Sequence, residues 1–321
     1  MSEAIFVVAR KEISDNIKSL RYWALVGLFI LLFTAMSAAV GVALRGLNIP
    51  GMEIGRGRFV VQLATSISNS MNYMAPLLGI ALGFAAIAAE REKGTLRLVL
   101  SRPIYRDQFL NGKILASVIL IFFAVFVSTI LALPISVALH GLTLTTEDLV
   151  RLLLSLIPST LLALAYYALA LFISVISDRS SRAFLYSLVA WIFFTFVLPI
   201  IASMIALSIL GPPPAISFNL TATGGRSGLP PQLQQYYQKS SQITSTILLI
   251  SPNNRFSSFV SALFSRGRQN AVGQQQGSST TYLDLGTVFS TRWIDLIVLI
   301  AYFIAFTALA YIFFVQRQEV R

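Results

Sequence analysis

Hydrophobic residues gather along the chain into six stretches, separated by short polar segments and by one long one. The stretches are Trp23–Leu44, Met71–Ala89, Ile114–Leu139, Leu152–Ser177, Ala183–Leu210 and Trp293–Val315. A helix needs about 20 consecutive, mostly apolar residues to cross a bilayer, so each stretch is long enough. Asp295 is the only charged side chain inside them, and we expect it in the first turn of the last helix. The pattern therefore predicts an all-α integral membrane protein with six transmembrane helices.

Composition supports the membrane assignment and removes several kinds of chemistry. Of the 321 residues 56% are hydrophobic and 12% are charged, whereas a soluble domain carries about 25% charged residues. The absence of cysteine excludes disulfides and thiolate metal sites. His140 is the only histidine, which argues against a multi-histidine metal centre.

Residues 1–22 precede the first stretch and predict an amphipathic helix. Phe6, Ala9, Ile13, Ile17 and Leu20 follow one another at three- and four-residue steps and form one apolar face. The helix either lies in the cytoplasmic interface or packs against the bundle. The segment contains several acidic residues, unlike the short basic start of a signal peptide, so we expect no cleavage.

The distribution of basic residues predicts the orientation. Of the 24 Lys and Arg residues, 14 fall on the side that holds both termini, residues 90–113 and the turn between the fourth and fifth stretches. Lys and Arg mark the cytoplasmic side of a membrane protein. We therefore expect a multi-pass protein of the cell membrane with both termini in the cytoplasm. The positive charge then reflects orientation and anionic lipid, not nucleic acid, because no basic run is interleaved with aromatic residues.

The division of the chain follows from these segments. Residues 23–210 hold the first five spans, residues 211–292 form a large extracellular loop, and residues 293–321 form the last span and a cytoplasmic tail. Within the loop, Pro231–Ile250 and Asn253–Phe264 predict two short external helices. The Gln-, Gly- and Ser-rich tract around 269–280 is typical of a flexible linker.

Catalytic motifs are missing from the sequence. It contains no Gly-x-x-x-x-Gly-Lys-[Ser/Thr] phosphate-binding loop, and His140 has no serine and carboxylate pattern around it. Ion-coupled carriers usually bury charged residues in mid-membrane, and none is expected here. The energy for transport would then come from a cytoplasmic partner.

The segment 90–113, between the second and third stretches, is the most charged part of the chain. A helix leaves the membrane through Glu90–Lys93 and breaks at Gly94, and Thr95 begins a short amphipathic helix that Pro103 ends. Such a helix suits docking into a groove of another protein. The alternative is a solvated loop whose leucines rest on lipid headgroups.

This segment closely resembles the signature of the permease subunits of type-2 ABC exporters. The family pattern is an acidic and basic cluster, Gly-Thr, Leu-x-x-Leu, Ser-x-Pro and then Gly-Lys. The matching residues are Glu90, Glu92, Gly94, Thr95, Leu96, Leu100, Ser101, Pro103, Gly112 and Lys113. Within the family, Ala9–Ile13 and Ser177–Ser181 are most similar to the branch that contains the permease for nitrous oxide reductase maturation.

The resemblance implies half of a transporter, which forms a homodimer or heterodimer of permeases. Each permease would sit on a separate ABC ATPase subunit that binds ATP and Mg, so no cofactor is expected in this chain. Residues 95–102 would form the coupling helix, and residues 1–22 the connecting helix of the family. The residues expected to contact the ATPase are Glu90, Arg91, Glu92, Gly94, Thr95, Leu96, Val99, Leu100, Ser101, Arg102, Pro103 and Arg106.

The second and fifth spans line the central route in that family. The residues expected on this substrate route are Gly79, Gly83, Trp191, Phe194 and Pro199. The Gly79-x-x-x-Gly83 pair permits close helix packing, either inside one subunit or in a dimer. The aromatic residues of the fifth span either line the route or face lipid. An uncharged route favours an apolar or amphipathic substrate.

The sequence thus predicts the permease subunit of an ATP-driven exporter. Two other classes stay open. An ion-gradient carrier or channel would transport without ATP, and a membrane scaffold for a soluble enzyme would bind a partner without any flux.

Overall fold

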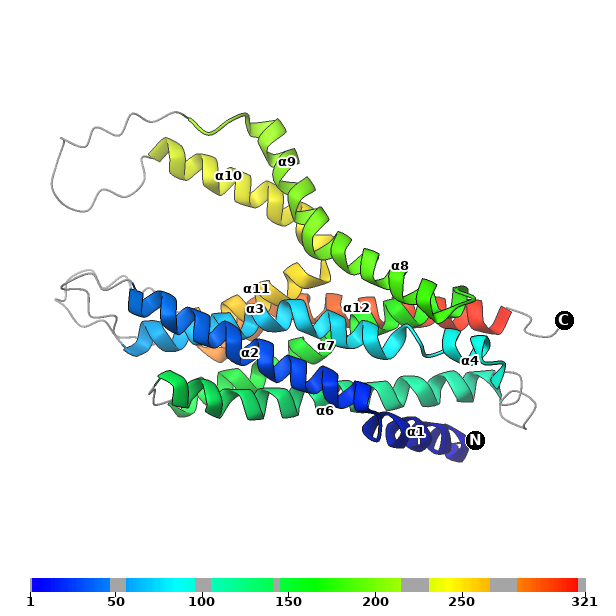
Figure 1. Cartoon of the computed structure of the whole chain (residues 1–321). Coiled ribbons are helices and arrows are strands. Elements are labelled where there is room, and N and C mark those ends of the chain that lie inside the picture. The colour runs from blue at the N-terminus through cyan, green and yellow to red at the C-terminus, as the bar shows by residue number, and fades with distance from the viewer. Residues whose placement is uncertain are drawn as a thin grey trace.

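The computed structural model describes residues 2–46, 56–95, 105–140, 145–214, 231–265 and 282–316. Helices dominate these segments (Figure 1). In chain order they are α1 (Ser2–Ile17), α2 (Leu20–Gly46), α3 (Arg56–Gly83), α4 (Ala88–Glu92), α6 (Arg106–His140), α7 (Thr146–Ile176), α8 (Ser180–Ile192), the π-helix η1 (Phe193–Val197), α9 (Leu198–Leu210), α10 (Pro231–Ile247), the 3₁₀-helix η2 (Leu248–Ile250), α11 (Pro252–Leu263) and α12 (Leu285–Gln316).

The membrane-spanning helices agree with the six apolar stretches. Among the described residues, five segments are long and apolar enough to cross a bilayer, and α1 with α2 makes a sixth that is bent by 64°. The five are Asn69–Glu92, Arg106–Ile135, Thr146–Ile176, Ser180–Leu210 and Leu285–Gln316. The chain is therefore an all-α integral membrane protein, as predicted.

The helices extend beyond the apolar stretches, and this changes the position of several charges. Thr145 caps α7 through a reciprocal pair of hydrogen bonds with Asp148, so the helix begins before the apolar run. Helix α12 begins at Leu285. Asp295 thus lies ten residues into α12, in its third turn, and the prediction that it lies in the first turn is wrong.

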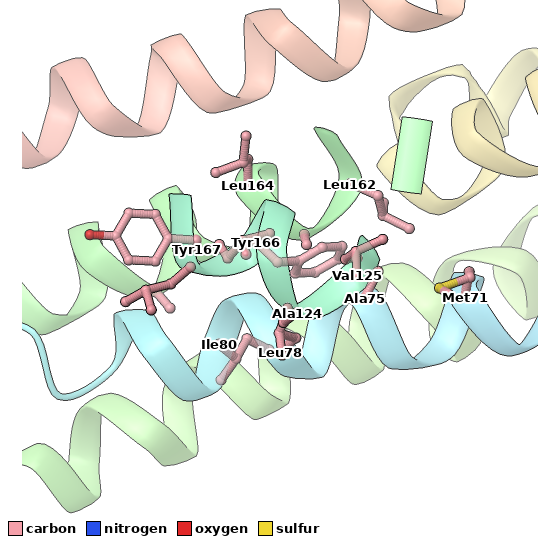
Figure 2. Close-up of a cluster of buried hydrophobic side chains, with 14 of the residues drawn as sticks. Met71, Ala75, Leu78, Ile80, Ala124, Val125, Leu162, Leu164, Tyr166 and Tyr167 are labelled. Carbon is pink, nitrogen blue, oxygen red and sulfur yellow. The ribbon is translucent and has the colours of Figure 1, made fainter. Parts of the chain in front are cut away.

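Helix α7 forms the centre of the bundle, with α3, α6, α11 and α12 packed around it. Figure 2 shows Tyr166 and Tyr167 of α7 among apolar side chains of α3 and α6. Both tyrosine side chains are fully buried. The share of buried residues in the most apolar part of α7 is 78%, so protein rather than lipid surrounds this span.

The two glycines of the second span lie where α3 touches α7. A Cβ atom at Gly79 would lie 2.1 Å from the Ala163 carbonyl oxygen, and one at Gly83 would lie 2.7 Å from the Tyr167 carbonyl oxygen. Such backbone contact is what small residues four apart permit. Of the alternatives left open by the sequence, packing within one subunit is the one found.

Helix α1 packs along α6, with Val8 and Ala9 buried. A Cβ atom at Gly112 of α6 would lie 2.7 Å from Val8 Cβ, so the two helices are in close contact. Phe6 and Val7 are exposed on the other side of α1. Helix α1 therefore packs against the bundle with one apolar face. Its other apolar residues, Phe6 and Val7, stay exposed among the described residues.

The bundle has two ends, which we call the terminal end, where both chain termini lie, and the loop end opposite it (Figure 1). The terminal end holds α1, α4 and the last turn of α12, and the loop end holds the first turns of α7 and α12 (Figure 1). Helices α9 and α10 lie side by side and diverge from the bundle, whereas α11 returns to pack against α3, α7 and α12. The two helices predicted between residues 231 and 264 are thus present, and α11 belongs to the bundle.

Candidate functional site

The predicted coupling segment begins where the second span ends at the terminal end. Helix α4 is followed by Gly94, whose φ of 71° lies in the left-handed region that glycine adopts readily. The Thr95 hydroxyl donates a hydrogen bond back to the Glu90 carbonyl oxygen (3.2 Å). The predicted break at Gly94 is therefore observed. The other predicted residues, Leu96, Val99, Leu100, Ser101, Arg102 and Pro103, lie outside the described residues.

Glu90 takes part in a buried ion cluster. Lys113 Nζ of α6 donates to Glu90 Oε1 (2.8 Å) and to Glu12 Oε1 of α1 (2.6 Å). The lysine is only 4% exposed, and its ammonium lies 5.0 Å from the centre of the Phe109 ring. We call Glu12, Glu90 and Lys113 the lysine cluster. The ammonium group of Lys113 thus links α6 to α1 and to α4.

Arg91 binds the end of α7. Its Nη1 donates to the carbonyl oxygens of Val175 (3.1 Å) and Ser177 (2.5 Å). A cation at a helix C-terminus is favourable because the last carbonyl groups have no partner within the helix. Close by, the Ser174 hydroxyl accepts hydrogen bonds from the N–H groups of Ile87 and Ala88 (3.1 and 2.9 Å). These bonds fix the turn between α3 and α4, which the sequence did not predict.

Glu92 and Arg106 contact two further helices. Glu92 Oε2 accepts hydrogen bonds from the N–H (3.1 Å) and hydroxyl (2.6 Å) of Ser180, at the start of α8. Arg106 Nη1 donates to the Val315 carbonyl oxygen in the last turn of α12 (3.5 Å). Among the described residues, the charged side chains expected to contact an ATPase thus bind their own chain: Glu90, Arg91, Glu92 and Arg106. They hold the two ends of the coupling segment against α1, α6, α7, α8 and α12.

The predicted route residues divide between two environments. Gly79 and Gly83 lie inside the contact with α7 described above, which favours a packing role for both. Trp191 and Phe194 are half-buried and pack against the core. Pro199 lies in the first turn of α9, directly after the π-helix, and proline cannot supply the hydrogen bond of a continuous helix.

The π-helix η1 interrupts the fifth span next to these aromatic residues. Its Phe194 carbonyl oxygen accepts a hydrogen bond from the Ser251 hydroxyl (3.3 Å), which precedes α11. The Trp191 and Phe196 rings make an edge contact at 5.7 Å. Single turns of π-helix are frequent at functional sites. Around η1 the span contacts α11 on one side, while Phe193 and Phe196 are exposed on another.

At the loop end, Arg151 of α7 binds the end of α11 and the residues that precede α12. It is 2% exposed and donates to the carbonyl oxygens of Leu263 (2.6 Å) and Leu283 (2.7 Å). Its guanidinium also pairs with Glu147 (2.7 Å) and lies over the Tyr282 ring. Arg151 therefore fixes the end of α11 and the approach to α12 onto α7.

A second charged pair lies deeper, between α11 and α12. Arg255 Nη1 lies 2.8 Å from Asp295 Oδ1, and Asp295 is 2% exposed. Asp295, the one charge that the sequence places inside a predicted span, is therefore buried and ion-paired. Beside this pair, Asn253 donates to the Asn72 carbonyl oxygen (2.8 Å) and accepts from the Tyr166 hydroxyl. The first turn of α11 is thus tied to α3, α7 and α12 by polar contacts.

The sequence did not predict the lysine cluster or the polar contacts that Arg151, Asn253 and Arg255 make with or from α11. Arg151 and Arg255 fell outside the predicted spans, and their partners are distant in the sequence. The one available signal was a lone charge at the edge of an apolar run, as for Lys113. Among the described residues, no group of acidic or histidine side chains is placed so that it could hold a metal ion.

Comparison with known proteins agrees with this architecture. A family model described as ABC-2 family transporter protein matches residues 6–319. The chain is 31% identical over 210 residues to the probable ABC transporter permease protein NosY of Stutzerimonas stutzeri, covering 64% of this chain and 71% of that protein. It is also 31% identical over 195 residues to the protein of the same name from Pseudomonas aeruginosa, covering 59% and 66% respectively. The chain therefore belongs to the ABC-2 family of transporter proteins, as the membrane subunit of an ABC transporter.

Proposed function

We propose that this chain is the permease subunit of an ATP-driven exporter that moves an apolar or amphipathic substrate outward. ATP and Mg would be bound and ATP hydrolysed by a separate ABC ATPase subunit. The family membership supports the partnership with an ATPase. In the proposed arrangement the chain lies in the cell membrane with its terminal end in the cytoplasm, facing the ATPase.

One observation carries the proposal: the three consecutive charges Glu90, Arg91 and Glu92 each bind a different part of the bundle. Glu90 binds Lys113 of α6, Arg91 binds the end of α7, and Glu92 binds the start of α8. A push on the segment that follows Gly94 would therefore reach several spans together. This arrangement suits a segment that receives mechanical work from a partner.

The fifth span and α10 supply the proposed contact with a second permease. Only 11% of the residues in the most apolar part of Ser180–Leu210 are buried, the same share as in α12, so exposure alone does not distinguish the two spans. Helices α9 and α10 diverge from the bundle (Figure 1), and α9 exposes several large aliphatic side chains, namely Ile200, Met204, Leu207 and Ile209. Apolar surface of this extent has either lipid or a second subunit as its neighbour. We propose a second permease around α9, with the route beside Trp191 and Phe194.

An ion-gradient carrier is the main competing function. It requires a charge that can bind or release an ion during transport. Asp295 is paired with Arg255 at 2.8 Å, so its charge is already balanced, which favours the ATP-driven proposal.

Co-purification with an ABC ATPase tests the proposal. The chain would be co-expressed with the ATPase subunit of its transporter, as wild type and as the double variant Leu96→Asp/Leu100→Asp. We expect a vanadate-sensitive ATPase to co-purify with the wild type and to be lost in the double variant. The matched control is Leu220→Asp/Leu229→Asp in the long loop, which should retain the ATPase. Failure of any ATPase to co-purify with the wild type would contradict the proposal.

A further inference from the structure

The lysine cluster brings together three segments that are far apart in the sequence. Lys113 and Glu12 are 101 positions apart, and Lys113 and Glu90 are 23 apart. The Lys113 side chain is 5% exposed, and those of Glu12 and Glu90 are 22% and 19% exposed. One buried ammonium therefore pairs with two carboxylates, one from α1 and one from α4.

The charges make this contact hard to break. Two carboxylates share one ammonium, so without Lys113 they would repel each other at short range in a poorly hydrated place. Removing one member of a buried ion pair is strongly destabilising, because it leaves a charge without compensation. The cluster thus resists any motion that would separate α1 from α4.

Packing next to the cluster also prevents α1 from sliding. A Cβ atom at Gly112 would lie 2.8 Å from Val8 Cγ1 and 3.0 Å from the Ile5 carbonyl oxygen. The helices are therefore in contact within one residue of Lys113. A displacement of α1 along α6 would have to break this contact and both ion pairs together.

The contact between Glu92 and α8 is of a different kind. The hydrogen bonds to Ser180 are exposed to solvent, and exposed polar contacts contribute little to stability. Glu90 and Glu92 lie two residues apart in α4, but their contacts differ in strength. Glu90 binds a buried ammonium, whereas the bonds of Glu92 are exposed. The firm junction is to α1 and α6, and the weak one is to α8.

We propose that the lysine cluster is the joint that makes α1 and α4 move as one body when the ATPase acts on the coupling segment. Glu12, Glu90 and Lys113 are then positioning residues for coupling: α1 shares the load and keeps the entry of the coupling segment in place. This inference rests on the proposed function, because it assigns the cluster a part in transmission as well as in folding.

Distances between spin labels on α1 and α4 test the joint. The chain has no cysteine, so the exposed Lys11 and Lys93 can each be replaced by cysteine and labelled without a background signal. With the cluster intact we expect one narrow distance distribution. It should stay unchanged when the complex with the ATPase is trapped with ATP and vanadate.

Substitutions in the cluster should loosen the joint. Lys113→Met is expected to broaden the distribution and to make it shift on vanadate trapping. Glu12→Gln removes one ion pair and leaves Lys113 paired with Glu90, so it should broaden the distribution less and serves if Lys113→Met fails to fold. The matched control is Lys18→Met, the same substitution at an exposed lysine, which should leave the distribution narrow.

Two results would overturn the inference. One is a distribution that stays narrow in both Lys113→Met and Glu12→Gln. The other is a wild-type distance that shifts on vanadate trapping, which would mean that α1 and α4 move separately. If no ATPase binds, the proposed function fails instead, and the distances in the chain alone still decide whether the cluster joins α1 to α4.

Discussion

Helix α7 and the fifth span are both 31 residues long and both apolar enough to cross a membrane, yet their surroundings are opposite. In the most apolar part of each, 78% of the α7 residues are buried but only 11% of those in Ser180–Leu210. The α7 sequence has small residues on the sides that meet other helices, including Ala163, Ala165, Ala168 and Ala170. The fifth span instead carries large aliphatic and aromatic residues that stay exposed.

The comparison teaches that apolar character places a helix in the membrane but does not determine its neighbours. Helices approach closely in lipid where side chains are small, because apolar tails solvate a leucine as well as another helix does. The glycines of α3 and the alanines of α7 meet this condition. Helix α7 is therefore the fixed centre of the subunit, and the fifth span is a surface for lipid or for the proposed second permease.

The largest effect is expected where α3 touches α7. Gly79→Leu would drive a side chain into the Ala163 carbonyl oxygen, so the helices must separate. We expect a loss of more than about 3 kcal/mol of stability, above the usual range for overpacking, or no folded protein. Thermal unfolding in detergent measures it. Gly27→Leu is the control, since a Cβ at Gly27 meets nothing within 4 Å; equal stability of the two variants would refute the contact.

Arg151→Met tests the role of α7 as the anchor of the long loop. It leaves the buried carbonyl group of Leu263 and the partly buried one of Leu283 without their donor. We expect a loss of about 3 kcal/mol, since each buried acceptor left unsatisfied costs about 1–3 kcal/mol. Hydrogen exchange should rise around residues 263 and 283. The exposed Arg10→Met is the control, and unchanged exchange in Arg151→Met would contradict the assignment.

Matched truncations in the two spans compare them directly. Leu162→Ala in α7 removes a fully buried side chain and should cost about 2–5 kcal/mol. Ile200→Ala in α9 removes one that is 58% exposed and should cost less than about 1 kcal/mol in the isolated subunit. Unfolding of the monomer in detergent gives both values. A cost for Ile200→Ala equal to that for Leu162→Ala would remove the distinction between the spans.

The smallest effect on stability is expected from a single cysteine on the exposed face of α9. Met204, 64% exposed, can be replaced by cysteine in this cysteine-free chain without disturbing the subunit. We expect an oxidative crosslink between two permeases in membranes. A cysteine at Ile119 of α6, also exposed, is the comparison site and should form none. Crosslinking at Ile119 but not at Met204 would place the second copy elsewhere.

Hydropathy and residue spacing predicted much of the fold. The six apolar stretches gave the spans, and the spacing of Gly79 and Gly83 indicated a close helix contact without naming α7 as its partner. The hydrogen bonds and ion pairs of buried charged residues were not predictable from hydropathy and spacing. Arg151 meets Leu283, 132 positions away, and Arg255 meets Asp295 only because α11 returns to the bundle. Such pairs depend on the three-dimensional path of the long loop, which periodicity does not encode.

For the proposed coupling segment, the sequence predicted the chain break but not the contacts of the charges. The family motif singles out residues 90–113, and the expected break at Gly94 is present. Glu90, Arg91 and Glu92 were expected to face a partner, yet they bind α6, α7 and α8 of their own chain. A charge next to a membrane helix satisfies nearby unpaired groups first, and the sequence does not reveal which groups are near.

Photo-crosslinking from the end of α4 tests the central claim most directly, namely that an ABC ATPase docks at the coupling segment. A benzophenone attached to Lys93→Cys, beside Gly94, would be illuminated in membranes that contain the assembled transporter. The account predicts a covalent adduct with the ATPase subunit, and none from the same label on Lys239→Cys in α10. Adducts with the ATPase from Lys239 but not from Lys93 would contradict it.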